Sequence, residues 1–304
     1  MRYFSIAVFA FFFLQSAYAN DMSLRVLAWS HGLSDYGVEM ASNSLDVTIN
    51  IDVYNSKREM YFFLTQHEQR PYDILLLPRK EIDWMGGDGR LLVKPEIREN
   101  ATSITHYSLD HKYGVFAARD HLAAVWSGPT QPSTWQDFFE VVRHERLNVA
   151  LTEKEDGVDA LMLANAFSPN RFSESELMHV GKIFTEIEWS RYESGESPAI
   201  VSFANAIASG VDAYFPSKET RTTDYLFSVS TLSENSEMAW RVLEVLVSKS
   251  ALTPLLYDGV SVFFEGKIHS PSKKVSSITA THNDVHASPR MTKLKAVLES
   301  SLDD

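Results

Sequence analysis

Acidic side chains stand where several elements of this sequence are predicted to begin. Glu153 and Asp156 are three residues apart in a predicted first helical turn, so they share one face of that helix. Asp224 directly precedes an apolar run. Carboxylates in such places can hold a cationic ligand through charge-assisted hydrogen bonds. Two other interpretations stay open: acids in a first turn also stabilise the helix dipole, and a turn aspartate caps its own backbone.

Two further side chains lie near the carboxyl ends of predicted strands. Trp29 closes the strand pattern 24–29, and Lys80 comes two residues after Pro78, which ends the apolar run 72–77. Ligands of open α/β sheets gather outside the carboxyl ends of strands, which favours positions facing a cleft. Core packing is the alternative for Trp29, and a solvated position on the rim is the alternative for Lys80.

Other chemistry finds little support in the sequence. The segment His282-Asn283-Asp284-Val285-His286 offers metal-ligand types, but it lies in an apparent loop. Zinc sites need three protein ligands that are themselves held by further hydrogen bonds. The sequence holds no G-x-S-x-G, no phosphate-binding loop and no G-x-G-x-x-G. Cysteine is absent, which excludes disulfides and thiolate sites. We therefore expect no enzyme, no metal and no cofactor.

The first nineteen residues are typical of a secretory signal peptide. Arg2 supplies a basic start, 6–14 is a short apolar run, and Ala17-Tyr18-Ala19 fits a signal peptidase site. The run is shorter than the roughly 20 residues of a membrane-spanning helix. Without a cysteine there is no lipid-modified N-terminus either. We expect a mature chain that starts at Asn20 and lies free in the periplasm.

Charge and length narrow the choice further. The formal net charge is −12, which argues against nucleic acid, whose phosphates need Lys and Arg. An acidic surface is compatible with a cationic ligand, although most acidic proteins simply stay soluble this way. Removing nineteen of the 304 residues leaves enough chain for two domains of about 150 residues each.

The hydrophobic patterns predict strands that alternate with helices, which indicates an α/β layered fold. Two capping boxes, Thr152-x-x-Glu155 and Ser173-x-x-Glu176, predict helix starts. Gly86-Gly87-Asp88-Gly89 is predicted to be a turn and 268–288 a surface connection. The predicted strands are 24–29, 47–54, 72–77 and 147–151, and the predicted helices are 57–66, 134–142, 153–165, 173–184, 236–248 and 291–302.

The order of these segments resembles the periplasmic spermidine/putrescine-binding proteins of polyamine transporters. The stretch 26–30 resembles that family's opening strand, and 54–61 resembles its second strand and the turn into a helix. The stretch 72–85 resembles its third strand. The stretch 149–170 resembles the strand and helix that open the second lobe. The collinear order carries this resemblance, which extends through most of the chain after residue 19.

The resemblance implies a two-lobed α/β periplasmic-binding-protein fold, with a ligand cleft between lobes joined by crossing hinge segments. Such proteins close around their ligand by hinge motion. We expect lobe 1 to comprise 20–119 and 223–263, and lobe 2 to comprise 120–222 and 264–304.

The resemblance also implies a site for a polyamine. Carboxylates would bind the ammonium groups, and aromatic faces would cover the methylenes at about 0.5–2 kcal/mol for each cation–π contact. The implied ligand-binding residues are a stacking Trp29 with the neighbouring Ser30, the paired acids Glu153 and Asp156, the ammonium-binding Asp224, and the aromatic Phe203.

The sequence departs from the family where that family supplies a hydroxyl, a tyrosine and a tryptophan. Arg79, Lys80 and Thr222 stand at these places. At about 4 Å and an effective dielectric of 20, two like charges cost roughly 4 kcal/mol, about a thousandfold in affinity. Lys80 therefore either points away from the site, or the ligand carries both signs of charge, as an amino acid or a carboxylated amine does.

Two functions follow from the resemblance. The first is a monomeric binding protein that delivers a polyamine or related amine to an inner-membrane ABC permease. The second keeps the fold and the pocket but makes the chain a periplasmic sensor subunit that docks on a membrane receptor. Site residues alone do not separate the two.

Overall fold

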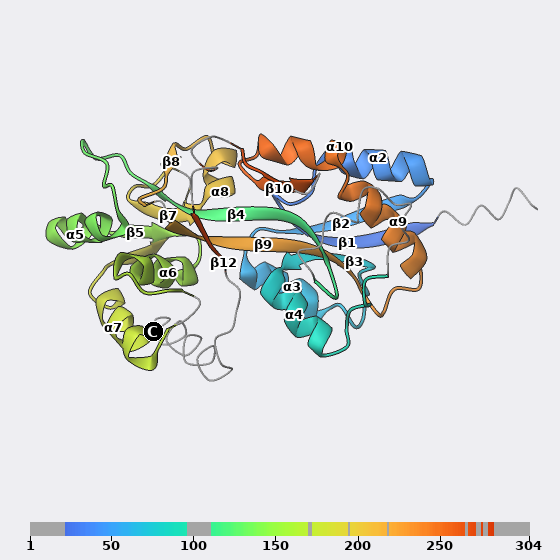
Figure 1. Cartoon of the computed structure of the whole chain (residues 1–304), viewed down its shortest axis with the longest axis horizontal. Coiled ribbons are helices and arrows are strands. Elements are labelled where there is room, and N and C mark those ends of the chain that lie inside the picture. Colours follow the sequence, from blue (N-terminus) through green and yellow to red (C-terminus); the bar gives the residue numbers. More distant parts are fainter. Residues whose placement is uncertain are drawn as a thin grey trace, which may run out of the picture.

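The computed structural model describes residues 22–95, 111–169, 172–193, 195–217, 219–264, 267–271, 275 and 279–282. Two α/β lobes lie side by side, and two long antiparallel strands run from one lobe into the other (Figure 1). These strands are β4 (Val115–Val125) and β9 (Glu219–Val229). The expected signal peptide 1–19, the terminal helix 291–302 and residues 283–286 of the histidine segment lie outside the described residues.

The first lobe is built on three parallel strands. The central strand β1 (Ser23–Trp29) pairs with β2 (Thr48–Tyr54) on one side and with β3 (Ile74–Pro78) on the other. β3 is apolar and almost wholly buried, as a strand covered by helices on both faces must be. The covering elements are α2 (Asp35–Leu45), α3 (Lys57–Thr65), α4 (Arg79–Gly87), α9 (Ser236–Leu246), α10 (Lys249–Leu252) and η2 (Thr253–Leu256).

The second lobe repeats this layering with shorter strands. Its strands are β5 (Val149–Leu151), β6 (Trp189–Arg191), β7 (Ala199–Ser202) and β8 (Ala213–Tyr214). Its helices are α5 (Trp135–Glu145), α6 (Lys154–Ala164), α7 (Glu174–Phe184) and α8 (Phe203–Ala208). Side chains cap the starts of three of these helices. Thr134 and Asp137 form a capping box on α5, Ser173 and Glu176 form the predicted one on α7, and the Ser202 hydroxyl caps α8.

The lobes have separate hydrophobic cores. One cluster packs around β1, β3 and the first-lobe part of β9, with Leu27, Leu76 and Phe227 fully buried. A second cluster packs Trp135, Phe138 and other side chains of α5, α6 and α7 against β5. A third, smaller one surrounds Phe203. Among the described strands, only β4 and β9 extend through both lobes. These two strands therefore also position the side chains that lie at the junction of the lobes.

Three local predictions differ from the structure. Glu153 is the N-cap of α6, and the Thr152 hydroxyl has no hydrogen-bond partner, so the predicted capping box does not form. Gly86 and Gly87 end α4, so only Asp88 and Gly89 of the predicted turn 86–89 form a turn. The predicted surface connection 268–288 contains β12 (Thr279–His282), which pairs in parallel with the start of β9, and part of β11 (Lys267–His269), which pairs with β10 (Ser261–Phe264).

Candidate functional site between the two lobes

An aromatic stack marks the end of the first-lobe sheet. Trp29, the last residue of β1, lies flat on Tyr225 of β9, with ring centroids 4.0 Å apart and planes at 4°. His31 meets the edge of the Trp29 ring at 5.3 Å. His31 also reaches the second lobe, where its Nε2 lies 2.7 Å from Oδ1 of Asn205 on α8. The stack therefore lies at the junction of the lobes and at the carboxyl end of a strand, where ligands of such sheets bind.

The strand register places Asp120 on the same sheet face as this stack. Ala118 and Asp120 of β4 stand opposite Tyr225 and Thr223 of β9, and alternate residues of a strand share a face. Asp120 is 6% exposed. Its carboxylate accepts hydrogen bonds from the Ser202 hydroxyl and from the Ala204 N–H of α8. Burial raises the pKa of Asp120, and its charge also contributes to a raised pKa of Tyr225.

A second buried acid, Glu81, lies in the first turn of α4, which follows β3 on the other side of β9 from β4. The Tyr61 hydroxyl of α3 donates to Glu81 Oε1 at 3.2 Å. Burial is the largest cause of the raised pKa of Glu81, while the charges of Lys57 and Lys80 oppose it. The charge of Glu81 acts on both Tyr54 and Tyr225, so this carboxyl group belongs to the same polar region.

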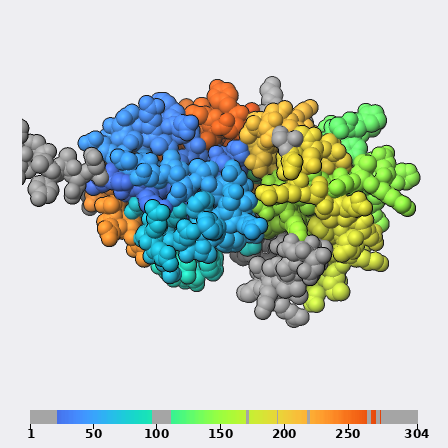
Figure 2. Space-filling model, turned by 180° about the vertical axis from the view of Figure 1, so that it is seen from behind, coloured from blue at the N-terminus to red at the C-terminus, as the bar shows by residue number. Residues whose placement is uncertain are grey.

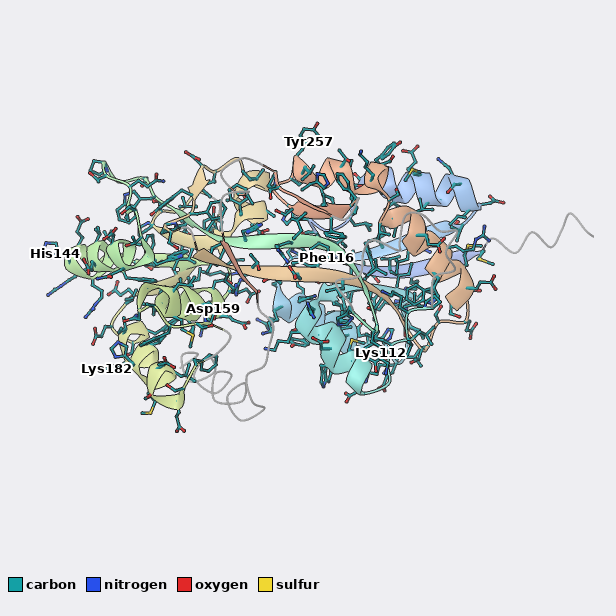
Figure 3. All side chains as sticks on the ribbon, in the orientation of Figure 1. Lys112, Phe116, His144, Asp159, Lys182 and Tyr257 are labelled. Carbon is teal, nitrogen blue, oxygen red and sulfur yellow. The ribbon has the colours of Figure 1, made fainter. Side chains whose placement is uncertain are left out.

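Arg221 binds two acids of the second lobe. Its Nη2 lies 2.6 Å from Asp156 Oδ1, and its Nη1 lies 3.0 Å from Asp159 Oδ2. Asp159 projects from α6 close to β9 (Figure 3). Two buried carboxylates thus share one guanidinium. Burial and the neighbouring carboxylates together outweigh the effect of Arg221 and raise the pKa of Asp156 to about 7.

Asp224 lies on the other face of β9. It stands directly opposite Arg119 of β4, and the two side chains form a bidentate pair, with Nε–Oδ1 at 2.6 Å and Nη2–Oδ2 at 3.0 Å. Their exposed fractions are 7% and 5%. Because Asp224 and Tyr225 are consecutive in a strand, their side chains point to opposite faces. The carboxylate expected to hold a ligand ammonium is thus occupied by an arginine, away from the aromatic stack.

Glu153 connects the lobes. Its Oε1 accepts the backbone N–H of Lys57, the first residue of α3, at 3.0 Å, although Glu153 itself is the N-cap of α6. In return the Lys57 Nζ donates to Glu155 Oε2 at 2.7 Å. Two helix starts from different lobes therefore face each other. The Glu153 carboxylate lies at the N-terminus of α3, where negative charge is favoured, and the Lys57 ammonium pairs with an acid in the first turn of α6. Figure 2 shows the blue and cyan surface of the first lobe in direct contact with the yellow and green surface of the second.

The remaining predicted residues lie around this region. The Ser30 hydroxyl, directly after Trp29, is buried without a hydrogen-bond partner. Lys80 is half-buried in the first turn of α4. Phe203 is buried in the second-lobe core, where its ring contacts Phe215 at 5.0 Å. The structure thus brings Trp29, Ser30, Lys80, Glu153 and Asp156 to the junction, whereas Asp224 faces away and Phe203 packs in a core.

The sequence interpretation missed the residues that depend on strand register. Arg119 and Asp120 lie in the middle of the long strand β4, and Arg221 and Tyr225 lie in β9. The available signal was the Arg119-Asp120-His121 segment between the apolar residues of β4, since Arg and Asp are seldom fully buried unless paired. Across the described residues, no group of three or more His, Asp or Glu side chains could hold a metal ion. In the same part of the chain, no helix is long and apolar enough to cross a membrane.

Comparison with solved structures identifies the architecture. The chain aligns over 93% of its length, with a TM-score of 0.71 and 12% identity, with 98% of the spermidine/putrescine-binding protein PotD of Streptococcus pneumoniae in complex with calcium and HEPES. The chain has the two-lobed periplasmic-binding-protein fold. No family model and no curated protein sequence matches it, so the likeness is carried by the structure alone.

Other proteins with a similar structure include one in complex with a different ligand. The lipoprotein TpPotD of Treponema pallidum aligns with a TM-score of 0.70 at 13% identity, covering 92% of this chain and 99% of its own. The protein MotA of A. tumefaciens, in complex with glucopine, aligns with a TM-score of 0.63 at 12% identity, covering 92% of this chain and 99% of its own. These neighbours confirm the predicted fold and its resemblance to polyamine-binding proteins. At this level of identity, the ligand must be argued from the residues at the junction.

Proposed function

We propose that the protein is a periplasmic solute-binding protein that captures a small amine-containing solute, a polyamine or a related amine, between its lobes. The observation that carries this proposal is the Trp29–Tyr225 stack with the buried carboxyl group of Asp120 on the same sheet face. An aromatic face stabilises an alkylammonium group by about 0.5–2 kcal/mol. A buried carboxylate adds a charge-assisted hydrogen bond.

The contacts between the lobes support capture by closure. Lys57 holds Glu153 and Glu155 across the junction, and His31 holds Asn205. Each contact joins an element of the first lobe to a helix of the second. Opening the hinge strands β4 and β9 would separate these pairs and expose the aromatic stack. A solute that bridges the same elements would favour the closed form, as expected for hinge closure around a ligand.

The signal-peptide pattern and the fold together support export to the periplasm and delivery of the solute to an inner-membrane ABC permease. N-terminal sequencing of the protein from a periplasmic extract should find Asn20 as the first residue. Recovery of the full-length chain in the membrane fraction would contradict export as a free protein.

Native mass spectrometry of the purified protein tests the binding function directly. We expect a bound small molecule, or a mass shift and a raised melting temperature when amines are added. A ligand present at 100 times its Kd should stabilise the folded state by about 2.7 kcal/mol. A protein that gains no stability from any amine, amino acid or polyamine at millimolar concentration would contradict the proposal.

A further inference from the structure

Two side chains of opposite charge flank the aromatic stack without an ion pair. Lys80 is half-buried, and no hydrogen bond or ion pair engages its ammonium group among the described residues. Its charge acts on Glu81, but that carboxyl group is bonded to Tyr61. Asp120 is buried, and its hydrogen-bond donors in the described part of the chain are neutral, although the charge of His31 also acts on it. The junction thus offers one cation and one carboxylate that form no ion pair among the described residues.

The sheet register fixes how far apart these two groups start. Pro78 of β3 and Ala118 of β4 both stand opposite Tyr225, one on each side of β9. Pro78 and Ala118 are therefore separated by two strand spacings of about 4.8 Å, or about 10 Å. Asp120 lies two residues further along β4, and Lys80 lies two residues further along the chain in the first turn of α4. The two side chains therefore start at the same end of the sheet, one on each side of β9.

The hydroxyl of Ser30 adds a neutral donor on the Lys80 side. Ser30 directly follows the end of β1, which pairs in parallel with β3, and Lys80 follows the end of β3, so both residues leave the sheet at the same edge. The Ser30 hydroxyl is buried and has no hydrogen-bond partner. A buried hydroxyl without a partner costs free energy that a ligand acceptor can recover. A carboxylate is such an acceptor, whereas an ammonium group is not.

The acids that would bind the second ammonium group of a polyamine already form ion pairs or hydrogen bonds with other groups of the protein. Arg221 binds Asp156 and Asp159, Arg119 binds Asp224, and the backbone N–H of Lys57 binds Glu153. Removing one partner of such a buried pair to accommodate a ligand would leave an arginine uncompensated. A second positive charge on the ligand would therefore meet Lys80 or displace an existing pair.

We propose that the solute is a small zwitterion whose ammonium group pairs with Asp120 beside the Trp29–Tyr225 stack and whose carboxylate pairs with Lys80 and Ser30. The ligand class is thus a carboxylated amine, such as a linear ω-amino acid. This inference rests on the proposed binding function and makes Lys80 the residue that selects against a plain diamine.

A matched pair of ligands tests this assignment. 4-Aminobutanoate and putrescine share a chain of four carbons with one terminal ammonium, and they differ in carrying a carboxylate or a second ammonium at the other end. Isothermal titration calorimetry of the wild-type protein should give 4-aminobutanoate a Kd at least about a hundredfold lower than that of putrescine, given the cost of two like charges at contact. Their longer homologues, 5-aminopentanoate and cadaverine, should show the same order.

Two variants locate the charges. Lys80→Gln should weaken 4-aminobutanoate at least about tenfold and should strengthen putrescine. Lys182→Gln makes the same charge change on the exposed side of α7 in the second lobe (Figure 3) and should alter neither Kd. Asp120→Asn keeps an acceptor for the Ala204 N–H but should weaken both ligands at least about tenfold, because both use the ammonium end.

The outcomes separate this inference from the function on which it rests. Tighter binding of putrescine than of 4-aminobutanoate, or equal effects of Lys80→Gln and Lys182→Gln, would overturn the zwitterion and leave an amine-binding protein. If none of the four ligands binds to wild-type protein that melts cooperatively, both the inference and the proposed function are wrong.

Discussion

Replacing Asp224 by alanine removes the carboxylate that binds Arg119 within the two strands joining the lobes. Both hydrogen bonds of the bidentate pair are lost, and the guanidinium of Arg119 stays buried because β4 and β9 remain paired on either side of it. The surroundings offer little compensation from solvent, since 5% of the Arg119 side chain is exposed. This change tests whether Asp224 belongs to the fold or to the ligand site.

The expected cost follows from that burial. Removing one partner of a buried ion pair costs about 3–5 kcal/mol, because it leaves an uncompensated charge. At about 2 °C per kcal/mol for a chain of this size, the melting temperature should fall by roughly 6–10 °C. Changing both residues, as in Arg119→Met with Asp224→Leu, should recover most of this loss, because apolar side chains of similar volume can replace a buried pair.

Urea denaturation followed by circular dichroism measures the effect, and the chain offers a matched control. Arg143 and Glu186 form an arginine–carboxylate pair of similar length, 2.7 Å, with side chains 50% and 42% exposed. Glu186→Ala should cost less than about 1 kcal/mol, as measured for other surface pairs. The difference in free energy of unfolding between the two variants then measures the effect of burying the pair, because both variants remove one carboxylate.

One result would refute this reasoning. If Asp224→Ala unfolds at the same urea concentration as the wild type but no longer binds its solute, Asp224 serves the ligand, and the site implied by the family resemblance is correct. A large loss of stability in Asp224→Ala, with solute affinity retained in the folded double variant, would instead assign the carboxylate to the hinge.

Three further predictions concern other groups at the junction. Burial raises the pKa of Asp156 to about 7 in the folded protein, so its carboxyl group keeps a proton that the unfolded chain releases near pH 4. The free energy of unfolding should therefore fall as pH rises from about 4 to 7, by up to about 1.4 kcal/mol per pH unit. Thermal melts of wild type and Asp156→Asn should show that slope only in the wild type. Lys57→Met removes a partly exposed pair worth about 1 kcal/mol or less, and it should shift the protein toward an open form with a larger radius of gyration in small-angle X-ray scattering, unlike Lys182→Met. Trp29→Ala should destabilise the first lobe by about 3–5 kcal/mol in urea denaturation, because it leaves a cavity against Tyr225; a loss below 1 kcal/mol would mean that the stack is not packed as described.

The sequence predicted the elements whose signals are local. The alternation in 47–54 and the apolar run 72–77 correspond to β2 and β3, and the Ser173 capping box starts α7. The Thr152 capping box carries the same signature but does not form. The helix begins one residue later, with Glu153 as its N-cap, and Glu155 binds Lys57 from the other lobe. The spacing of residues cannot reveal such a contact between lobes.

The site was predictable only in part for a related reason. Trp29 and Lys80 could be placed because strand ends are visible in the sequence. The partners of the carboxylates could not, because Arg119 and Asp224 are 105 residues apart, and Arg221 and Asp156 are 65 apart. Their pairing depends on the register of β4 with β9 and on how α6 packs against β9. A shift of one residue in β4 would turn Asp120 away from the stack, and the same shift in β9 would bring Asp224 to the face that Tyr225 now occupies.

The placement of arginines at the junction links the stability of the hinge to the choice of ligand. A carboxylate that faces a ligand must lose its hydration when the lobes close, and the ligand's ammonium must then compensate it. When an arginine of the same strand pair compensates that carboxylate permanently, as Arg119 does for Asp224, the hinge gains a fixed contact but the site loses a place for a positive charge. Asp120 keeps such a place because its hydrogen-bond donors are neutral, while Lys80 adds a positive charge two strands away. A solute with one charge of each sign satisfies both groups at once, whereas a diamine leaves Lys80 unmatched and adds a repulsion.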